Sequence, residues 1–164
     1  LAICAELKNL HIIAVDCTVD VLEVAARNLQ RHESLLSPRN NRIELVESNL
    51  FSKFSPAAKL DFIISNPPYI PSDTISSLQV DVAQYEPHTA LDGGKDGLSF
   101  YRYLLETAPS LLAQDGEMLL EIGFDQQADL SSLKQNFPVW KSSAFLPDLQ
   151  GNDRVWQLGL SQLL

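Results

Sequence analysis

Apolar and polar positions along the first part of the chain follow two alternating patterns. Short apolar runs bounded by polar residues predict strands at 11–16, 42–47 and 60–65, and the first of these runs is typical of a buried strand. Between the first two runs, apolar residues recur at i, i+3, i+4 and i+7 from Leu22 to Leu29, which predicts a helix. Thr18 stands where a residue could cap that helix.

The polar and irregular stretch 71–95 interrupts this alternation. It predicts a long loop with one helical turn near 75–82, and loops of such length are often functional. The pattern then resumes. The remaining predicted elements are a helix over 98–112 bent at Pro109, a turn at 115–116, a strand over 117–122, a helix over 128–137, and strands over 139–145 and 154–160.

Strands that alternate with helices predict an α/β fold with a parallel sheet and helices on both of its faces. The last two strands predict an antiparallel hairpin at its edge. No linker long enough to separate two domains is present, so residues 1–164 are expected to form one domain. In such sheets, ligands bind beyond the carboxyl ends of the strands.

Composition narrows the classes of function. The 164 residues are 45% hydrophobic, which fits one folded domain. The 12 Lys and Arg against 21 Asp and Glu give a net charge of −9, which disfavours nucleic acid as a partner but leaves room for a small local groove. The two cysteines and three histidines form no metal-ligand or disulfide pattern, so we expect no metal and a reducing, cytoplasmic compartment. No membrane span or signal segment is expected.

Polar residues follow the first two predicted strands. Asp16 ends the first and could accept hydrogen bonds from both hydroxyls of a ribose, or it could cap the following helix. These two interpretations are evenly balanced. Asn49 and Leu50 follow the second strand and could meet the edge and face of an adenine, although a plain turn is the better interpretation from the residues alone.

The segment Asn66-Pro67-Pro68-Tyr69 follows the third strand and carries the strongest signal. Two prolines hold the chain extended and leave the carbonyls of Asn66 and Pro67 free as acceptors. Two acceptors beside an aromatic ring suit a planar NH2 group, whose nitrogen lone pair they could orient toward an electrophilic carbon. The alternative is a proline-stiffened surface turn; the polar tetrapeptide directly after an apolar strand favours the catalytic interpretation.

This tetrapeptide resembles the signature of S-adenosylmethionine-dependent methyltransferases that act on planar NH2 nitrogens. Further segments resemble the HemK/PrmC family, which methylates the glutamine of the Gly-Gly-Gln motif in class 1 peptide chain release factors. These segments are Tyr85-Glu86-Pro87, Ala90 to Gly94, Asp96 to Leu98, Tyr101, Leu120 to Gly123 and Gly151 to Val155. The resemblance covers nearly the whole chain and implies a Rossmann-like class I methyltransferase sheet.

The resemblance also implies roles for individual residues. It assigns Asp16 to the ribose of S-adenosylmethionine and Asn49 and Leu50 to its adenine, although the family usually has Asp at position 49. Asn66 would contact cofactor and substrate. Pro67, Pro68 and Tyr69 would complete the glutamine pocket, with Asn66, Pro67 and Tyr69 as the catalytic set. The product would be S-adenosylhomocysteine.

Other residues carry weaker assignments. Glu86, Asp92 and Arg154 are expected either to order the pocket or touch the protein substrate, or only to brace loops. Three glycines, Gly93, Gly94 and Gly97, are interpreted as turn residues because no strand precedes them.

A member of this family is expected to have a strand and a glycine-rich loop before the helix that begins near Leu1, and an N-terminal docking domain. Without that strand, the strands at 11–16 and 60–65 would flank a gap. We therefore expect residues 1–164 to be an incomplete methyltransferase domain, inactive alone. Either they are part of a longer enzyme, which the intact motifs favour, or a remnant without cofactor binding. Nucleic-acid amino methylation and a non-catalytic binding module remain the alternative functions.

Overall fold

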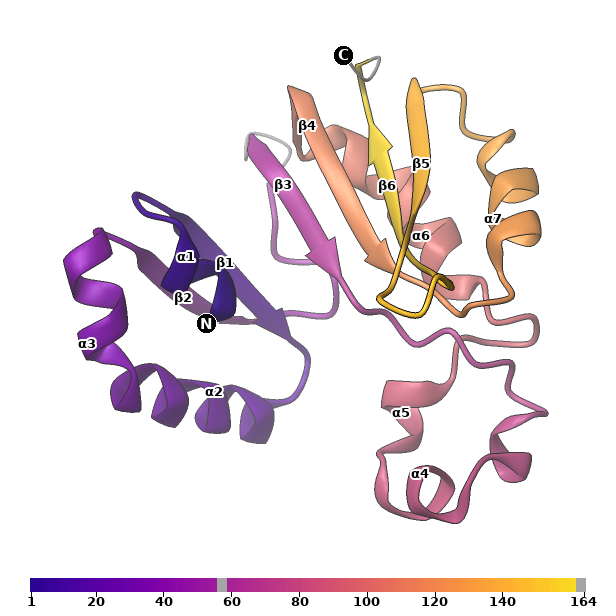
Figure 1. Ribbon diagram of the computed structural model, residues 1–164, viewed down its shortest axis with the longest axis horizontal. Helices are drawn as coiled ribbons and strands as arrows, with labels where there is room; N and C mark the ends of the chain where they lie inside the picture. The colour runs from indigo at the N-terminus through magenta and orange to yellow at the C-terminus, as the bar shows by residue number, and fades with distance from the viewer. Residues whose placement is uncertain (56–58, 162–164) are drawn as a thin grey trace. The chain divides into compact units, whose positions relative to one another are not determined.

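The computed structural model describes residues 1–55 and 59–161. The chain forms two compact units, Leu1–Phe54 and Ser55–Leu164. Figure 1 labels their helices and strands, and each unit is considered by itself below. The helix–strand alternation is an α/β arrangement in both.

The first unit is built around a two-stranded parallel sheet. Strands β1 and β2 pair in register from His11↔Arg42 to Asp16↔Glu47. Parallel strands need a long crossover, which the helices between them supply. In chain order the elements are α1 (Ala2–Glu6), β1 (His11–Asp16), α2 (Val19–Arg31), α3 (Glu33–Leu36), the 3₁₀ turn η1 (Ser37–Arg39) and β2 (Arg42–Glu47). The predicted strands at 11–16 and 42–47 and the helix after Thr18 are confirmed.

The side chain of Asn41 joins α1 to this sheet. Its Oδ1 accepts a hydrogen bond from the amide of Leu10 at 2.9 Å, and its Nδ2 donates to the carbonyls of Cys4 and Leu7 at 3.0 and 2.9 Å. The Cys4 side chain is fully buried. One amide therefore satisfies three backbone groups at the start of the sheet.

The prediction that β1 is a buried strand was wrong. None of its side chains is fully buried, and Val15 is 37% exposed. Helix α2 likewise has no buried residue. The reason is that β1 belongs to a sheet of only two strands, so its faces are incompletely covered.

The second unit contains a four-stranded sheet in the order β3-β4-β6-β5. Strand β4 is parallel to β3 and antiparallel to β6, and β5 and β6 form the predicted antiparallel hairpin. The elements are β3 (Leu60–Ser65), η2 (Ile75–Ser77), α4 (Val80–Tyr85), α5 (His88–Leu91), α6 (Ser99–Thr107), η3 (Ala108–Ser110), β4 (Leu112–Glu121), α7 (Gln127–Lys134), β5 (Ser142–Pro147) and β6 (Asp153–Gly159). In Figure 1, α4 and α5 lie beyond the carboxyl ends of β3 and β4.

The hydrophobic core of this unit lies between the sheet and α6. Tyr101 of α6 and Trp156 of β6 are fully buried, with their rings edge to face at 6.4 Å between centroids. Phe145 of β5 stacks on the Trp156 ring, with 5.7 Å between the ring centroids. The indole N–H of Trp140 donates to the carbonyl of Leu105 at 3.0 Å, which ties the start of β5 to α6. Burial of these aromatic rings, together with the hydrogen bond made by the Trp140 indole, stabilises the packing of α6 against the sheet.

The structure corrects the predicted elements on either side of Pro109. The helix ends at Thr107 and continues only as a 3₁₀ turn, and the predicted turn at 115–116 lies inside the long strand β4. The register jumps there from Leu60↔Leu112 to Phe62↔Glu117, which marks a bulge. A local bulge replaces the turn because both flanking segments pair with the same neighbour. The stretch 71–95 also holds three helical segments instead of one turn.

The two strands that were expected to flank a gap, β1 and β3, both lie at sheet edges. β1 ends one sheet and β3 ends the other, so the described strands form two sheets instead of the single parallel sheet predicted. Along β3, Phe62 and Ile64 are 59% and 61% exposed although Ile63 between them is buried. Among the described residues, no helix is long and apolar enough to cross a membrane.

Candidate functional site

Asp16 and the turn after β2 lie at one edge of the two-stranded sheet. The amide of Ser48 donates to the carbonyl of Asp16 at 2.9 Å, which brings the two strand ends together. The Oδ1 atom of Asp16 accepts a hydrogen bond from the amide of Thr18 at 2.8 Å. Asp16 thus braces the turn that leads into α2; the N-cap position itself is Thr18, and no described side chain caps the helix. Within the described residues the Oδ2 of Asp16 accepts no hydrogen bond, so one carboxylate oxygen remains available to a hydroxyl.

Asn49 and Leu50 form a tight turn at the same edge. Leu50 has a positive φ of 49°, and the amide of Ser52 donates to the carbonyl of Asn49 at 3.1 Å. The Asn49 side chain is exposed beside the end of β1. The turn interpretation is therefore correct, and it leaves the amide of Asn49 accessible to a planar polar edge.

In the second unit, Asn66 follows the last paired residue of β3. Ser65 pairs with Leu120 of β4, so the start of the tetrapeptide is held by the sheet. Pro67 is buried, whereas the Asn66 side chain is exposed. Among the described residues none hydrogen-bonds this side chain, and its amide faces solvent as a free donor and acceptor.

Two glycines lie directly against the backbone of Pro68 and Tyr69. A Cβ added to Gly93 would stand 2.8 Å from the Cα of Tyr69 and 2.9 Å from the carbonyl oxygen of Pro68. A Cβ added to Gly97, whose φ is 72°, would collide with the Tyr69 carbonyl oxygen. Gly97 has the positive φ of a turn residue, and both glycines also allow a backbone approach that no side chain permits.

Residues 70–72, which follow Tyr69, pair with residues 91–94, and these two short segments together form a neck. Ile70 donates to the carbonyl of Leu91 at 3.0 Å and accepts from the amide of Gly93 at 2.9 Å. The hydroxyl of Ser72 and the amide of Gly94 both donate to Asp92 Oδ1, at 2.6 and 2.8 Å. These bonds hold the pKa of the Asp92 carboxyl below its usual value, first through the Ser72 hydroxyl. Asp92 therefore braces the loop, which was one of its two predicted roles.

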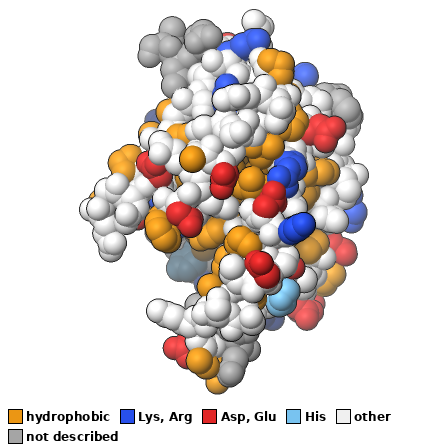
Figure 2. All heavy atoms as spheres, turned by 90° about the vertical axis from the view of Figure 1, so that its right-hand side faces the viewer, with side chains coloured by type: hydrophobic (Ala, Val, Ile, Leu, Met, Phe, Trp, Pro, Cys, Tyr) orange, Lys and Arg blue, Asp and Glu red, His pale blue; other side chains and the backbone are white. Residues whose placement is uncertain are grey.

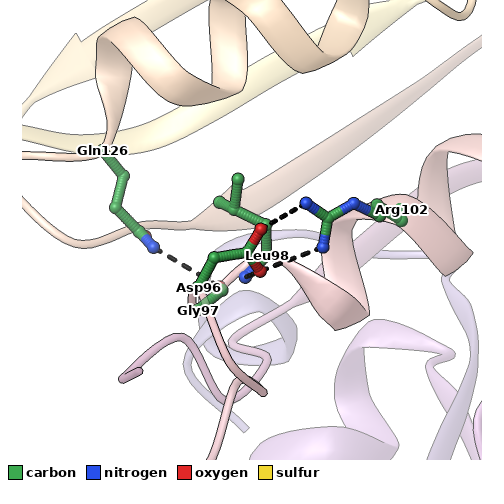
Figure 3. Close-up of polar contacts among 5 residues, drawn as sticks. All are labelled: Asp96, Gly97, Leu98, Arg102 and Gln126. Carbon is green, nitrogen blue, oxygen red and sulfur yellow. Dashed lines mark hydrogen bonds and ion pairs between the residues drawn. The ribbon is translucent and has the colours of Figure 1, made fainter. Parts of the chain in front are cut away.

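An ion pair stabilises the start of α6 beside this neck. Both oxygens of Asp96 accept from the guanidinium of Arg102, one of them at 3.0 Å, and the amide of Leu98 donates to Asp96 Oδ1 at 3.2 Å (Figure 3). The Arg102 hydrogen bonds lower the pKa of Asp96 to about 2. The pair orients the turn that carries Gly97.

Among the described residues, two further sequence candidates make no hydrogen bond or ion pair with the tetrapeptide. Arg154 donates to the carbonyl of Ile122 at 3.4 Å and pairs with Asp148 at 3.7 Å, so it braces the β5–β6 hairpin. Glu86 is exposed between α4 and α5.

Sequence reasoning missed Asp96, Arg102 and Gln126. The ion pair spans six residues across a helix start, outside the usual i, i+4 spacing, and Gln126 looks like any polar residue before a helix.

Charged side chains of both signs are interspersed on the face drawn in Figure 2, without a basic patch there. In the part of the chain that the structure describes, no group of three or more His, Cys, Asp or Glu side chains could hold a metal ion.

Comparison with solved structures defines the class of fold. The chain is similar to a methyltransferase from Pyrococcus furiosus, with a TM-score of 0.65 and 21% identity over 98% of this chain and 68% of the other. The predicted Rossmann-like class I methyltransferase fold is thereby confirmed.

Sequence comparison confirms the resemblance to one family of methyltransferases. The release factor glutamine methyltransferase of Agrobacterium fabrum is 38% identical over 94% of this chain and 51% of its own length. That of Thermosynechococcus vestitus is 37% identical over 86% of this chain and 47% of its own. The chain spans about half the length of these curated relatives. No family model matches it.

The contact between Gly97 and Tyr69 predicts a large cost for a single methyl group. Gly97→Ala should lower the free energy of unfolding by about 2 kcal/mol more than Gly151→Ala, because overpacking adds to the cost of a positive φ. Gly151 is the matched control, since its φ is 87° and nothing lies within 4 Å of an added Cβ. Urea unfolding measures both, and equal losses would contradict the close contact.

The Asp96–Arg102 pair predicts a stability contribution that depends on pH. Folding lowers the Asp96 pKa from 3.8 to about 2, so the contribution is complete above about pH 4 and is lost as the pH falls toward 2. Asp96→Asn should cost about 1 kcal/mol at pH 7, a value reduced by solvent exposure, and progressively less as the pH falls through 2. A ¹³C NMR titration should place the Asp96 midpoint near 2 and move it upward in Arg102→Gln; a midpoint unmoved by that change would rule out the pair.

Proposed function

We propose that the protein containing this chain transfers a methyl group from S-adenosylmethionine to the side-chain amide nitrogen of the glutamine in the Gly-Gly-Gln motif of peptide chain release factors. The observation that carries the proposal is the exposed Asn66 amide at the end of β3, followed by two prolines and Tyr69, with the backbone of Pro68 and Tyr69 packed against Gly93 and Gly97. The similarity to curated release factor glutamine methyltransferases supports this choice of substrate.

The tetrapeptide provides the chemistry that an amide nitrogen needs. The lone pair of an amide nitrogen is delocalised, so the nitrogen attacks a methyl group only when its orientation is fixed. The Asn66 Oδ1 atom and the Pro67 carbonyl each accept one N–H of the glutamine amide, while the Tyr69 ring packs on its flat face and Pro68 completes the pocket. These acceptors turn the nitrogen lone pair toward the methyl carbon. The amide proton then leaves to solvent as the nitrogen–carbon bond forms.

Residues of the first unit are proposed to hold the cofactor. S-adenosylmethionine supplies the methyl group from its sulfonium, and S-adenosylhomocysteine is the product. The Oδ2 of Asp16, which is free among the described residues, would accept a ribose hydroxyl. The exposed Asn49 amide would bond the adenine edge, and Leu50 would pack on its face. A neutral amide suits an adenine edge because it carries both a donor and an acceptor.

The partner is a protein and not a polyanion. A net charge of −9 over these residues opposes association with phosphate backbones and so favours a protein substrate over a bare polyanion. Release factors act at the ribosome, so we place the reaction in the cytoplasm.

A labelling experiment on the full-length protein tests the proposal. Incubation with S-adenosyl-[methyl-³H]methionine should label a class 1 release factor, but neither its Gly-Gly-Ala version nor DNA. Label on DNA without label on the release factor would favour nucleic-acid amino methylation. No label on either, with no cofactor binding by calorimetry, would favour a binding module.

Asn66→Ala should lower kcat for release factor methylation about 100-fold or more, because one of the two acceptors that orient the amide is lost. The fold should be retained, since the Asn66 side chain is exposed. Asn136→Ala, an exposed asparagine after α7, is the matched control and should behave as wild type. A rate near that of wild type in Asn66→Ala would refute its role.

Asp16→Ala should weaken cofactor binding by about 1 to 3 kcal/mol, the usual cost of a hydrogen bond to a charged group. Asp20→Ala, an exposed carboxylate in the first turn of α2, controls for the change in charge. Isothermal titration calorimetry with S-adenosylhomocysteine measures both dissociation constants. Equal constants for the two variants would show that Asp16 does not bind the ribose.

A further inference from the structure

Gln126 is a buried amide between β4 and α7, with 8% of its surface exposed. It comes five residues after the end of β4 and directly precedes α7. A buried primary amide must satisfy two donors and an acceptor oxygen with two lone pairs, so its surroundings are restrictive. The partners of Gln126 come from three segments that are far apart in the sequence.

Both protons of the Gln126 amide are used. Its Nε2 donates to the carbonyl oxygen of Tyr69 at 3.2 Å and to that of Gly97 at 3.4 Å, and Figure 3 shows the side chain reaching toward Gly97. The first of these carbonyls ends the Asn66–Tyr69 tetrapeptide. The second belongs to the glycine that packs against Tyr69.

The Gln126 oxygen is used as well. Its Oε1 accepts from the amide of Gly123 at 2.9 Å. The Tyr101 hydroxyl lies 3.4 Å from the same oxygen, but its single proton goes to the carbonyl of Glu121 at 2.8 Å. The N–H of Gly123 can only donate and the carbonyls of Tyr69 and Gly97 can only accept, so the orientation of the amide is determined by its partners. An ionised glutamate could not serve the two carbonyls, and a lysine could not serve Gly123.

These bonds anchor the tetrapeptide at its downstream end. Upstream, Ser65 is held by its pairing with Leu120 in β4. Between the two anchors stand Asn66 and two prolines, whose φ angles are restricted by their rings. With both ends held and the middle stiff, the backbone that carries the Asn66 side chain has little freedom left.

We propose that Gln126 is a positioning residue for methyl transfer: it holds Tyr69 and Gly97 in place and thereby sets the position of the Asn66 and Pro67 acceptors. The inference rests on the function proposed above. Gln126 touches neither substrate nor cofactor and acts through the tetrapeptide. Its loss should therefore lower kcat and leave the affinity for S-adenosylmethionine unchanged, because orientation matters most in the transition state.

Four variants of the full-length protein test this role. Gln126→Met removes the hydrogen bonds to Tyr69, Gly97 and Gly123 at nearly constant volume. Gln126→Glu, assayed at pH 9, keeps the acceptor and the length but loses the donors, and it serves if the first variant does not fold. Gln127→Met is the matched control on the exposed neighbouring residue. Trp140→Phe removes a buried hydrogen bond to Leu105 elsewhere in the unit and controls for lost stability.

Both Gln126 variants should lower kcat for release factor methylation at least tenfold, with KM for S-adenosylmethionine within twofold of wild type. Gln127→Met and Trp140→Phe should retain kcat within twofold. A folded Gln126 variant with unchanged kcat would overturn the proposal. So would an equal loss of kcat in Trp140→Phe, because the effect would then follow stability alone.

Hydrogen exchange measures positioning without any substrate. In the neck, the amide of Ile70 donates to the carbonyl of Leu91, and the amide of Gly93 donates to the carbonyl of Ile70. Both amides should exchange at least tenfold faster in the Gln126 variants than in Gln127→Met. Unchanged exchange would overturn the proposal. A wild-type protein that fails to label the release factor would instead refute the proposed function, and the exchange rates would still decide whether Gln126 holds the tetrapeptide.

Discussion

The arrangement of the second unit depends on direct contact between two stretches of backbone, Pro68–Tyr69 and Gly93–Gly97. A side chain at either glycine would separate them. Because they touch, Ile70 can pair with the segment around Asp92, and one amide, that of Gln126, can reach both carbonyls. The same contact sets where α6 begins, two residues after Gly97, and α6 carries the side chains that pack the core. A requirement for small residues in one loop is thus linked to the placement of the tetrapeptide and of the hydrophobic core.

The first unit has a different balance of forces. Its two-stranded sheet buries little apolar surface, and among the residues whose burial is described Cys4 is its one fully buried hydrophobic side chain. Specific polar contacts contribute more to it: Asn41 satisfies three backbone groups at one end of the sheet, and Asp16 and Ser48 join the strands at the other. Such contacts each contribute about 1 kcal/mol, so they define geometry more than they supply stability. The edge that carries Asp16 and Asn49 is therefore well defined in position although the unit has a small core.

Local patterns in the sequence predicted the strands of this fold well, and predicted its site in part. The strands at 11–16, 42–47 and 60–65 have the predicted bounds because apolar runs flanked by polar residues are a local signal. The turn predicted at Asp115-Gly116 failed because pairing with Leu60 on one side and Phe62 on the other kept the chain extended through a bulge. The tetrapeptide could be recognised because two prolines constrain their own backbone. Gln126 could not, since Tyr69 and Gly97, which its amide holds, lie far from it in the sequence and only the folded chain brings them together.

The segment between Ser72 and Asp92 begins and ends at the same neck of the second unit. Its two ends are joined by backbone pairing at Ile70 and by the Ser72 hydroxyl, so the geometry of the neck does not depend on the length of chain between them. The entropy of closing such a loop rises only slowly with its length, by about 0.6 kcal/mol for each doubling. Insertions and substitutions at exposed positions between Ser77 and Ala90 can thus accumulate without displacing Asn66. The surface shown to a macromolecular partner and the geometry of the chemistry are free to evolve separately.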